Sequence, residues 1–429
     1  MTKHKVILVS LIGIVMIFAS TMAHAKIYLD IFGKSFKKIT IGIPSFKGDG
    51  VDKLNTDMSG LLNKDLDMSG FFIVAPQSLI DKELVDEGVE KNEIKFTNWK
   101  SIGIELVCKG KIQKSNNELI LEAFVYDTLD GTLVLAKRYK TKEDDWRRIV
   151  HRLADDIMLY VTGEKGIMSS RVVFASGSRN RKDIYIADID GSNVRRMTNY
   201  RSITLSPSIS PNSNYLAYTS YREGKPNLYI MNIASNREVY TDRSDGMKIG
   251  TTWTGNSTFG YSHTSGKFST IYSINVDSKT KKILQKNDGI ATSPSISPDG
   301  SKMVFVSDIH GSPQIFIKDL PSGTPKRLTY SGNYNTSPAL SPKGDLIAFV
   351  SKFEGAFEIC TMNIDGSNQR VLTLGGINDS PQFSPCGRYI IYSSNKGGKF
   401  NIQLMLFNGE GKKTLKFTDG DETQPRFVQ

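Results

Sequence analysis

The chain has few cysteines and, after its first 25 residues, no long apolar run. It has only three cysteines among 429 residues, at positions 108, 360 and 386. An odd and scattered set of this kind does not form the paired framework of a small exported domain. Cys360 lies in an apolar stretch and is expected in the core, whereas Cys386 stands in a predicted turn, where it can be exposed. Beyond the first 25 residues no run approaches the ~20 apolar residues of a membrane-spanning helix.

Signatures of catalysis are also missing. Histidine occurs five times, and no two of the three histidines after residue 25 are neighbours in sequence. The chain has no Gly-x-Ser-x-Gly pentad, no His-Glu-x-x-His pair and no Gly-x-x-x-x-Gly-Lys-Ser/Thr loop. The stretches 188–193 and 363–368 resemble a calcium loop, but they lack its closing glutamate and read as turns. We therefore predict no catalytic residue, no metal ligand and no cofactor, and leave open an ion in a central channel.

The first 25 residues have the pattern of a secretory signal. Lys3 and Lys5 precede an apolar stretch over 6–18, and Ala23 and Ala25 give a small-x-small cleavage site. The alternative is an uncleaved anchor. A formal net charge of +11 would suit nucleic acid, but export and the lack of clustered stacking aromatics argue against that partner.

What the chain has in abundance is one repeat of about 44 residues, which opens with Ser-Pro-x-x-Ser-Pro-x-Gly. It begins at Ser206, Ser293, Ser337 and Ser380, with degenerate copies at 251 and 424. Each copy carries two nearly continuous apolar blocks and a short third block, which are typical of strands covered on both faces. Asp-Gly pairs mark the turns between them. Four strands per repeat predict the blades of a β-propeller, with the prolines confining the opening strand to the innermost edge.

The two ends of the repeat array indicate how the ring closes. Residues 171–198 lack the Ser-Pro strand, and the last seven residues, 423–429, form an orphan opening strand. Pairing of the two completes a sixth blade and removes exposed edges. The alternative, an open array of hairpins, would leave two unpaired edges.

Residues 26–162 follow a different pattern and predict a small α/β domain, joined to the propeller (169–429) by a linker over 163–168. We expect strands over 38–43, 71–74, 99–111, 118–127 and 132–139. Apolar spacing predicts helices over 50–66 and 143–161. At about 137 residues the domain can hold its own core.

The two domains in this order resemble the TolB family, the periplasmic propeller proteins of the Tol-Pal system in Gram-negative envelopes. The resemblance rests on the Ser-Pro repeats, on Trp99-x-x-Ile-Gly-x-x-Leu-Val-x-x-Gly110 and on the hairpin from Asp127 to Gly131. It implies a monomeric, non-enzymatic periplasmic adaptor that supports outer-membrane integrity and the inward movement of that membrane at cell division. It also implies two partners: TolA of the inner membrane and Pal, a peptidoglycan-associated outer-membrane lipoprotein.

By this resemblance the segment after the cleavage site, 26–34, docks on TolA. Its residues alternate in a way that suits a strand added to the edge of a partner's sheet; an edge strand of its own domain is the alternative, and both can hold in different states. The predicted contacts with TolA are Lys26, Ile27, Tyr28, Leu29, Asp30, Ile31 and Phe32.

The predicted Pal-binding face is the end of the propeller that carries the blade-to-blade connections and the loops from second to third strands. The loops hold nine basic residues against Glu223, Asp308 and Glu354, which predicts a positive surface that captures an acidic partner; the alternative is that loops of a basic protein are simply basic. The predicted contacts are Thr292, Asn335, Thr336, Asn378, Asp379, His310, Arg179, Arg181, Arg222 and Lys225.

A rival function uses the same end of the propeller. Asp379, Asp421 and Glu422 would surround the channel mouth and could serve a propeller enzyme or a glycan-binding propeller. Pull-down with the two envelope partners, set against a screen for glycan binding or hydrolysis, separates these functions.

Overall fold

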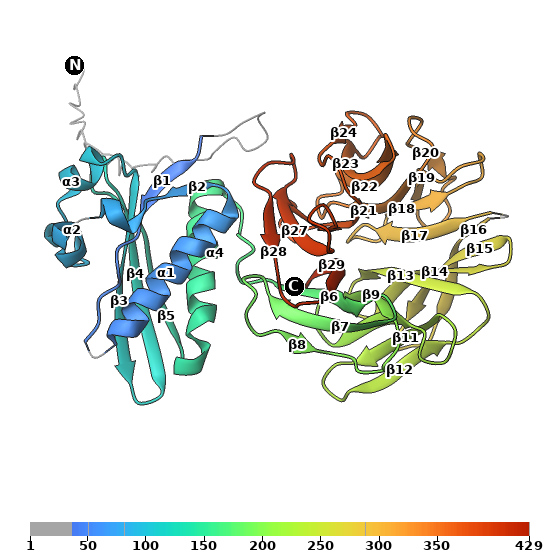
Figure 1. Ribbon diagram of the computed structural model, residues 1–429, viewed down its shortest axis with the longest axis horizontal. Coiled ribbons are helices and arrows are strands. Elements are labelled where there is room, and N and C mark those ends of the chain that lie inside the picture. The colour runs from blue at the N-terminus through green and yellow to red at the C-terminus, as the bar shows by residue number, and fades with distance from the viewer. Residues whose placement is uncertain (1–36, 50, 81, 288, 429) are drawn as a thin grey trace, which may run out of the picture.

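A computed structural model describes residues 37–49, 51–80, 82–287 and 289–428 (Figure 1). It has two domains, an α/β domain and a propeller. The predicted TolA-docking segment 26–34 and the signal 1–25 lie outside the described residues.

The first domain is a five-stranded sheet in the order β2-β1-β3-β4-β5, in which β1 runs parallel to β2 and β3, and β3, β4 and β5 are antiparallel. Its strands are β1 Ile39–Gly42, β2 Phe72–Val74, β3 Leu106–Ser115, β4 Glu118–Asp127 and β5 Leu133–Lys142. Its helices are α1 Asp52–Ser69, α2 Lys82–Asp86, α3 Phe96–Ser101 and α4 Trp146–Thr162, with 3-10 turns η1 Gln77–Leu79, η2 Lys91–Glu93 and η3 Glu143–Asp145.

The long helices α1 and α4 lie side by side on one face of this sheet (Figure 1). Their apolar residues join those of the strands in a single core that includes Leu62, Leu121 and Leu153. Each helix ends at a glycine in the left-handed region, Gly70 (φ 77°) and Gly163 (φ 73°), a conformation that costs glycine little. The expected helices are thus present, with α1 three residues longer at its end than predicted.

The strand predicted over 99–111 is wrong in its first part, because residues 96–101 form α3 and the strand begins at Leu106. Trp99 faces inward from this helix and its indole Nε1 donates to Glu87 Oε2 at 2.8 Å. Lys109 Nζ lies 3.0 Å from the same oxygen, and all three side chains are buried. The sequence pattern over 99–105 was typical of a strand. In the structure Trp99 lies on a helix and Lys109 on a strand, and both bind the buried carboxylate of Glu87.

The second domain is a ring of six four-stranded blades, as predicted. Blades 1 to 5 each take four consecutive strands: β9 Thr204–Ile209, β10 Tyr215–Ser220, β11 Asn227–Asn232, β12 Arg237–Asp242; β13 Met247–Thr254, β14 Thr258–Ser265, β15 Phe268–Asn275, β16 Lys281–Asn287; β17 Ala291–Ile296, β18 Lys302–Ser307, β19 Gln314–Asp319, β20 Lys326–Arg327; β21 Asn335–Leu340, β22 Leu346–Phe353, β23 Ala356–Asn363, β24 Arg370–Val371; β25 Asn378–Phe383, β26 Tyr389–Ser394, β27 Asn401–Leu406, β28 Lys413–Leu415.

Blade 6 closes the ring and confirms the predicted pairing of the two ends. It combines the last strand, β29 Asp421–Val428, with β6 Arg171–Ser178, β7 Arg181–Asp188 and β8 Arg195–Arg196. β29 runs antiparallel to β6, with Asp421 opposite Gly177 and Val428 opposite Arg171. β6 thereby becomes an interior strand of the blade, and β29 takes the innermost position, as the Ser-Pro strands do in the other blades.

The Ser-Pro motif forms a bulge in the innermost strand of each blade that carries it. Ser206 and Pro207 lie where the register shifts between β9 and β10, so that two residues face one on the neighbouring strand. The residue before the proline has a positive φ in all these blades, 50–56° at Ser206, Ser293, Ser337, Ser380 and Gln424. The bulge takes the proline, which has no N–H, out of the hydrogen-bonded ladder.

The first domain docks on the end of the propeller opposite the predicted Pal-binding face. We call this end the turn face, because it carries the Ser-Pro turns and the Asp-Gly hairpins. There Tyr389 donates from its hydroxyl to Ser69 O at 2.9 Å, and Arg388 Nη2 donates to Thr162 O at 3.0 Å. The linker is part of this contact, since Met168 is buried and its N–H donates to Asp155.

At the centre of the contact His151 of α4 is buried between two carboxylates. Its Nδ1 lies 2.8 Å from Asp65 Oδ2 of α1, and its Nε2 lies 3.4 Å from Asp190 Oδ2 in the β7–β8 hairpin of blade 6. Arg147 also pairs with Asp190. A charged network therefore joins both helices to the propeller.

Candidate functional site

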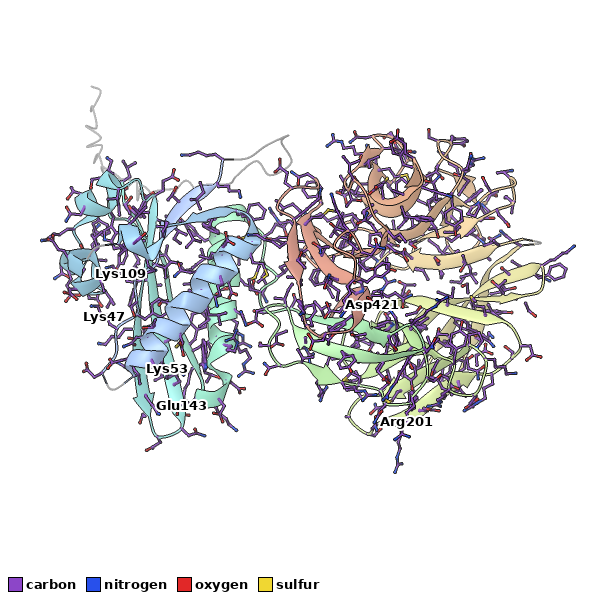
Figure 2. The ribbon with its side chains drawn as sticks, viewed as in Figure 1. Lys47, Lys53, Lys109, Glu143, Arg201 and Asp421 are labelled. Carbon is purple, nitrogen blue, oxygen red and sulfur yellow. The ribbon has the colours of Figure 1, made fainter. Side chains whose placement is uncertain are left out.

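The opposite end of the propeller is left uncovered by the first domain. We call it the loop face: it carries the blade-to-blade connections and the hairpins between second and third strands. Arg201, in one connection, is exposed and projects from the surface (Figure 2). The predicted contact residues belong to this face or to the strand ends beneath it.

A group of exposed apolar residues covers the loop face over blades 2 to 5. We call it the apolar crescent: Met247, Phe268, Ile290, Ile309, Tyr330, Tyr334, Phe353, Leu374 and Ile377. Tyr330 is 72% and Leu374 is 70% exposed, and exposed apolar residues that gather on one face mark an interaction site. None of these residues is among the predicted contacts. The available signal was apolar residues placed in connections, where turn chemistry favours polar ones.

The basic side of the loop face lies over blades 6 and 1, and much of its charge is neutralised. Arg222 pairs with Glu238 and stacks on the ring of Tyr229, 3.9 Å from its centroid, while Lys225 Nζ lies 2.6 Å from Asp245 Oδ1. The loops themselves hold nine basic residues against three acidic ones, but Glu238 from a strand and Asp245 from a connection offset part of that positive charge. Arg179 and Arg181 are exposed.

The predicted contact residues at the strand ends separate into two groups. Asn335 and Asn378 are 1% and 2% exposed, so neither side chain is available to a partner in this conformation. Thr292, Thr336 and Asp379, one position further along each strand, are partly exposed. The sequence predicted all five at the channel mouth but could not separate the buried residues from the partly exposed ones.

Asn378 has a structural task within blade 5. Its Nδ2 donates to Phe357 O at 3.0 Å, to Glu358 Oε2 at 3.0 Å and to Gly375 O at 3.2 Å. Glu358 is itself buried and also accepts from Thr373 Oγ1 and Gly375 N. The amide thus satisfies a buried carboxylate and two carbonyls that tie neighbouring strands together.

Asn378→Ala is therefore expected to lower the free energy of unfolding by about 1–3 kcal/mol, because it leaves a buried charged acceptor without one of its donors. Chemical denaturation of the full chain measures this. Thr336→Ala is the control, since its side chain is partly exposed, and its unfolding free energy should stay within about 0.5 kcal/mol of wild type. Equal stability of the two variants would contradict the structural role.

The remaining predicted residues fit the rival catalytic function poorly. Glu422 is fully buried and accepts from Phe417 N at 2.8 Å and from the backbone and side chain of Thr418. Burial raises its pKa against those hydrogen bonds. Asp421 accepts from Phe400 N at 3.2 Å. The expectation that Glu422 lies open at the channel mouth is wrong. His310 is exposed in a loop, with its ring centroid 5.9 Å from that of Phe316.

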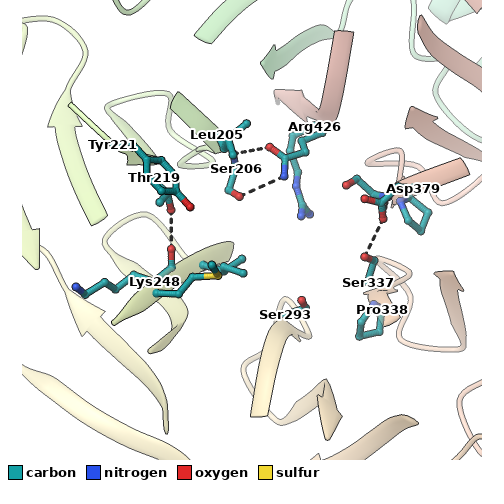
Figure 3. Close-up of a pocket in the computed structure, with 15 residues that line it drawn as sticks. Leu205, Ser206, Thr219, Tyr221, Lys248, Ser293, Ser337, Pro338, Asp379 and Arg426 are labelled. Carbon is teal, nitrogen blue, oxygen red and sulfur yellow. Dashed lines mark hydrogen bonds between the residues drawn. The ribbon is translucent and has the colours of Figure 1, made fainter. Parts of the chain in front are cut away.

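A central channel runs between the innermost strands and widens into two cavities. The cavity nearer the loop face has a volume of about 310 Å³ and is lined by Ser206, Ser293, Ser337, Asp379 and Arg426, among others (Figure 3). The cavity nearer the turn face has a volume of about 180 Å³. Asp379 Oδ1 accepts from Ser337 Oγ at 3.0 Å and from Ser380 N at 2.6 Å, which fixes its carboxylate on the channel wall.

An α/β domain on one end of a closed six-bladed propeller, with an open and partly apolar face at the other end, defines a class of two-domain propeller proteins with a free binding face. The sequence profile of the TolB beta propeller domain matches residues 159–429, and that of the TolB amino-terminal domain matches residues 27–134. The chain belongs to the TolB family.

Individual relatives agree with this membership. A "Protein TolB homolog" from Chlorobium luteolum is 33% identical over 285 residues, covering 66% of this chain and 65% of that protein. The "Tol-Pal system protein TolB" of Desulfosudis oleivorans is 32% identical over 230 residues, 53% of this chain and 52% of that protein. The alignments thus span less than two thirds of these relatives' lengths.

The fold agrees as well. The crystal structure of TolB from Acinetobacter baumannii matches with a TM-score of 0.81, covering 91% of this chain and 97% of that one at 24% sequence identity. Within the described residues, every helix falls short of the length and apolar character needed to cross a bilayer.

Proposed function

We propose that this protein is a non-enzymatic periplasmic adaptor of the Tol-Pal type. In this proposal the loop face of the propeller binds a Pal-type lipoprotein of the outer membrane, and the segment 26–34 binds TolA. The complex supports outer-membrane integrity and the inward movement of the outer membrane at division. Membership of the TolB family supports the proposal, and the two partners follow from the family resemblance.

The observation that carries the propeller half of the proposal is the open loop face. Protein interfaces combine an apolar, aromatic-rich centre with a polar rim. The apolar crescent provides such a centre, with Tyr334 packed edge-on against Phe357 at a centroid distance of 5.9 Å. Arg179 and Arg181 lie towards the basic side and provide a charged rim. The first domain, docked on the turn face, leaves this surface accessible.

Tyr334→Ala and Ile377→Ala are each expected to weaken binding of the soluble domain of the organism's own peptidoglycan-associated lipoprotein by about tenfold or more, because large apolar side chains at an interface centre dominate affinity. Isothermal titration calorimetry with the full chain measures the dissociation constant. Val371→Ala is the matched control: Val371 is 47% exposed, but it lies on the outermost strand of blade 4.

Unchanged affinity in both crescent variants, with Val371→Ala behaving like wild type, would remove the apolar crescent from the proposal. Absence of any binding by the wild-type chain would remove the Pal-type partner itself. The TolA half of the proposal concerns residues outside the described part of the chain, and deletion of 26–34 followed by titration with TolA tests it separately.

A further inference from the structure

The innermost strands place one side chain per blade on the wall of the cavity nearer the turn face, and in five blades this residue stands two positions after the one with the positive φ. These six equivalent residues form what we call the waist ring: Ser208, Thr252, Ser295, Ala339, Gln382 and Arg426. Five of them are uncharged. Arg426 of blade 6 is the one charged member of the ring and has its longest side chain.

Polar members of the waist ring bond to the next blade. Thr252 Oγ1 accepts from Ile296 N at 3.4 Å, Ser295 Oγ from Leu340 N at 3.1 Å, and Gln382 Oε1 from Phe427 N at 2.7 Å. A guanidinium has donors only and cannot accept such a bond. Arg426 therefore cannot make the bond that Thr252, Ser295 and Gln382 make at this position in their blades.

The guanidinium of Arg426 instead reaches into the open channel (Figure 3). Arg426 lines the cavity nearer the loop face and also the cavity nearer the turn face. Among the described residues, none makes a hydrogen bond or an ion pair with its side chain. Burial lowers the pKa of Arg426 to about 10 against the charge of Asp379, which raises it, so the group stays cationic at neutral pH.

The surroundings add donors and one competing charge. The hydroxyls of Ser293 and Ser380 line the same cavity, and within the described residues neither has a hydrogen-bond partner. Asp379 is the only carboxylate on this cavity wall, and two donors already hold its Oδ1. Arg426 and Asp379 are not within ion-pair distance. A cation with five donors thus faces the cavity without an acceptor from any described residue.

We propose that the propeller channel binds a carboxylate group, which Arg426 receives in the cavity nearer the loop face with help from the hydroxyls of Ser293 and Ser380. A planar carboxylate matches the two-pronged donor geometry of a guanidinium better than a spherical anion does. A volume of about 310 Å³ accommodates a small free acid or one acidic side chain presented from the loop face. This inference does not depend on the proposed adaptor function.

The test uses trifluoroacetate as a probe for the full chain, with ¹⁹F line broadening as the readout and acetate as the competitor. Wild type is expected to broaden the resonance, and acetate to restore it. Arg426→Gln is expected to weaken binding by about tenfold or more through loss of a charge-assisted contact. Asp379→Asn is expected to strengthen it about threefold, because a like charge leaves the cavity. Ser208→Ala, in the same ring, is the control and should match wild type.

Glutamine is a suitable replacement because blade 5 carries Gln382 at the equivalent position, so Arg426→Gln should melt at or above the wild-type temperature. Stronger competition by N-acetyl-glutamate amide than by acetate would assign the site to an acidic side chain, and stronger competition by acetate would assign it to a small free acid. Either result supports the proposal that the channel binds a carboxylate group. No broadening by wild type, equal broadening by Arg426→Gln, or competition by chloride as strong as by acetate would overturn the proposal.

Discussion

Truncation of the chain after Gly420 is expected to lower the melting temperature of the propeller sharply. β29 supplies the innermost strand of blade 6, and its loss leaves β6 without a partner on one side. Phe427 and Val428 are 7% and 2% exposed, and burial of each contributes about 1.5–3 kcal/mol. Glu422 also leaves, with its three hydrogen bonds to the connection after β28.

The destabilisation extends beyond one strand, because ring closure makes each blade a neighbour of two others. We expect the melting temperature to fall by about 10 °C or more, since a loss above about 5 kcal/mol corresponds to that shift in a domain of this size. Calorimetry and size-exclusion chromatography measure it, the latter because unpaired edges associate between chains. A truncated chain that melts like wild type and elutes as a monomer would refute this account of closure.

Addition of a separate peptide covering 421–429 gives a sharper control. If the missing strand is the cause, the peptide should restore the melting temperature by pairing with β6, and a scrambled peptide of the same composition should not. Restoration by both peptides would point to a general effect of the added peptide instead.

The parts of this fold that the sequence predicts are those encoded locally. A repeat of Ser-Pro, apolar blocks and Asp-Gly turns defines each blade within about 44 residues, and the unequal ends of the array define the closure. The helices α1 and α4 follow from apolar spacing. Trp99 was placed in a strand because the buried carboxylate that holds it, Glu87, is 12 residues away and carries no periodic signal.

The candidate site was less predictable, because its character depends on contacts between blades. Thr336 and Asn335 are neighbours in sequence, yet the first is partly exposed and the second is buried in the blade. Glu238 and Asp245 neutralise Arg222 and Lys225 from other segments. Arg426 was part of the orphan strand in the sequence, and only the closed ring places it among five uncharged equivalents.

The hairpins at Asp190 and Asp365 show most clearly that a short sequence pattern does not predict contacts with distant segments. Each aspartate starts the same Asp-Gly-Ser-Asn turn, and each accepts from the serine two residues on, N–H at 2.9 Å and Oγ at 2.6 Å. The sequence could only call both of them turns. In the structure Asp365 is exposed, whereas Asp190 lies against α4 and pairs with Arg147 and His151.

The charges in this contact between the domains act on one another. Burial alone would lower the pKa of His151, but Asp190 and Asp65 outweigh it and raise the pKa to about 9 from an ordinary value of 6.5. Burial would raise the pKa of Asp190, yet His151, Ser192 and Arg147 hold it well below its usual range. Burial raises the pKa of Asp65 against the opposing influence of His151.

Asp190→Asn is expected to lower the unfolding free energy by about 3 kcal/mol at pH 6, because it leaves the buried imidazolium of His151 with one carboxylate instead of two. The estimate takes the low end for a broken buried pair, since the Arg147 side chain is 35% exposed and can turn to water. Asp365→Asn is the matched control: it alters the same two turn hydrogen bonds without touching α4. Denaturation of the two variants side by side isolates the contribution of the domain contact.

The pH dependence of the unfolding free energy tests whether the charge of His151 stabilises the contact between the domains. The pKa of His151 is raised on folding, so its contribution is complete below about pH 6.5 and is lost as the pH rises through about 9. The pKa of Asp190 is lowered, so its contribution is present above its ordinary 3.8 and is lost only in more acidic solution. Wild type and Asp365→Asn should therefore lose stability between pH 6.5 and 9, and Asp190→Asn should lose much less. Parallel pH curves for all three proteins would show that the contact between the domains does not depend on the charge of His151.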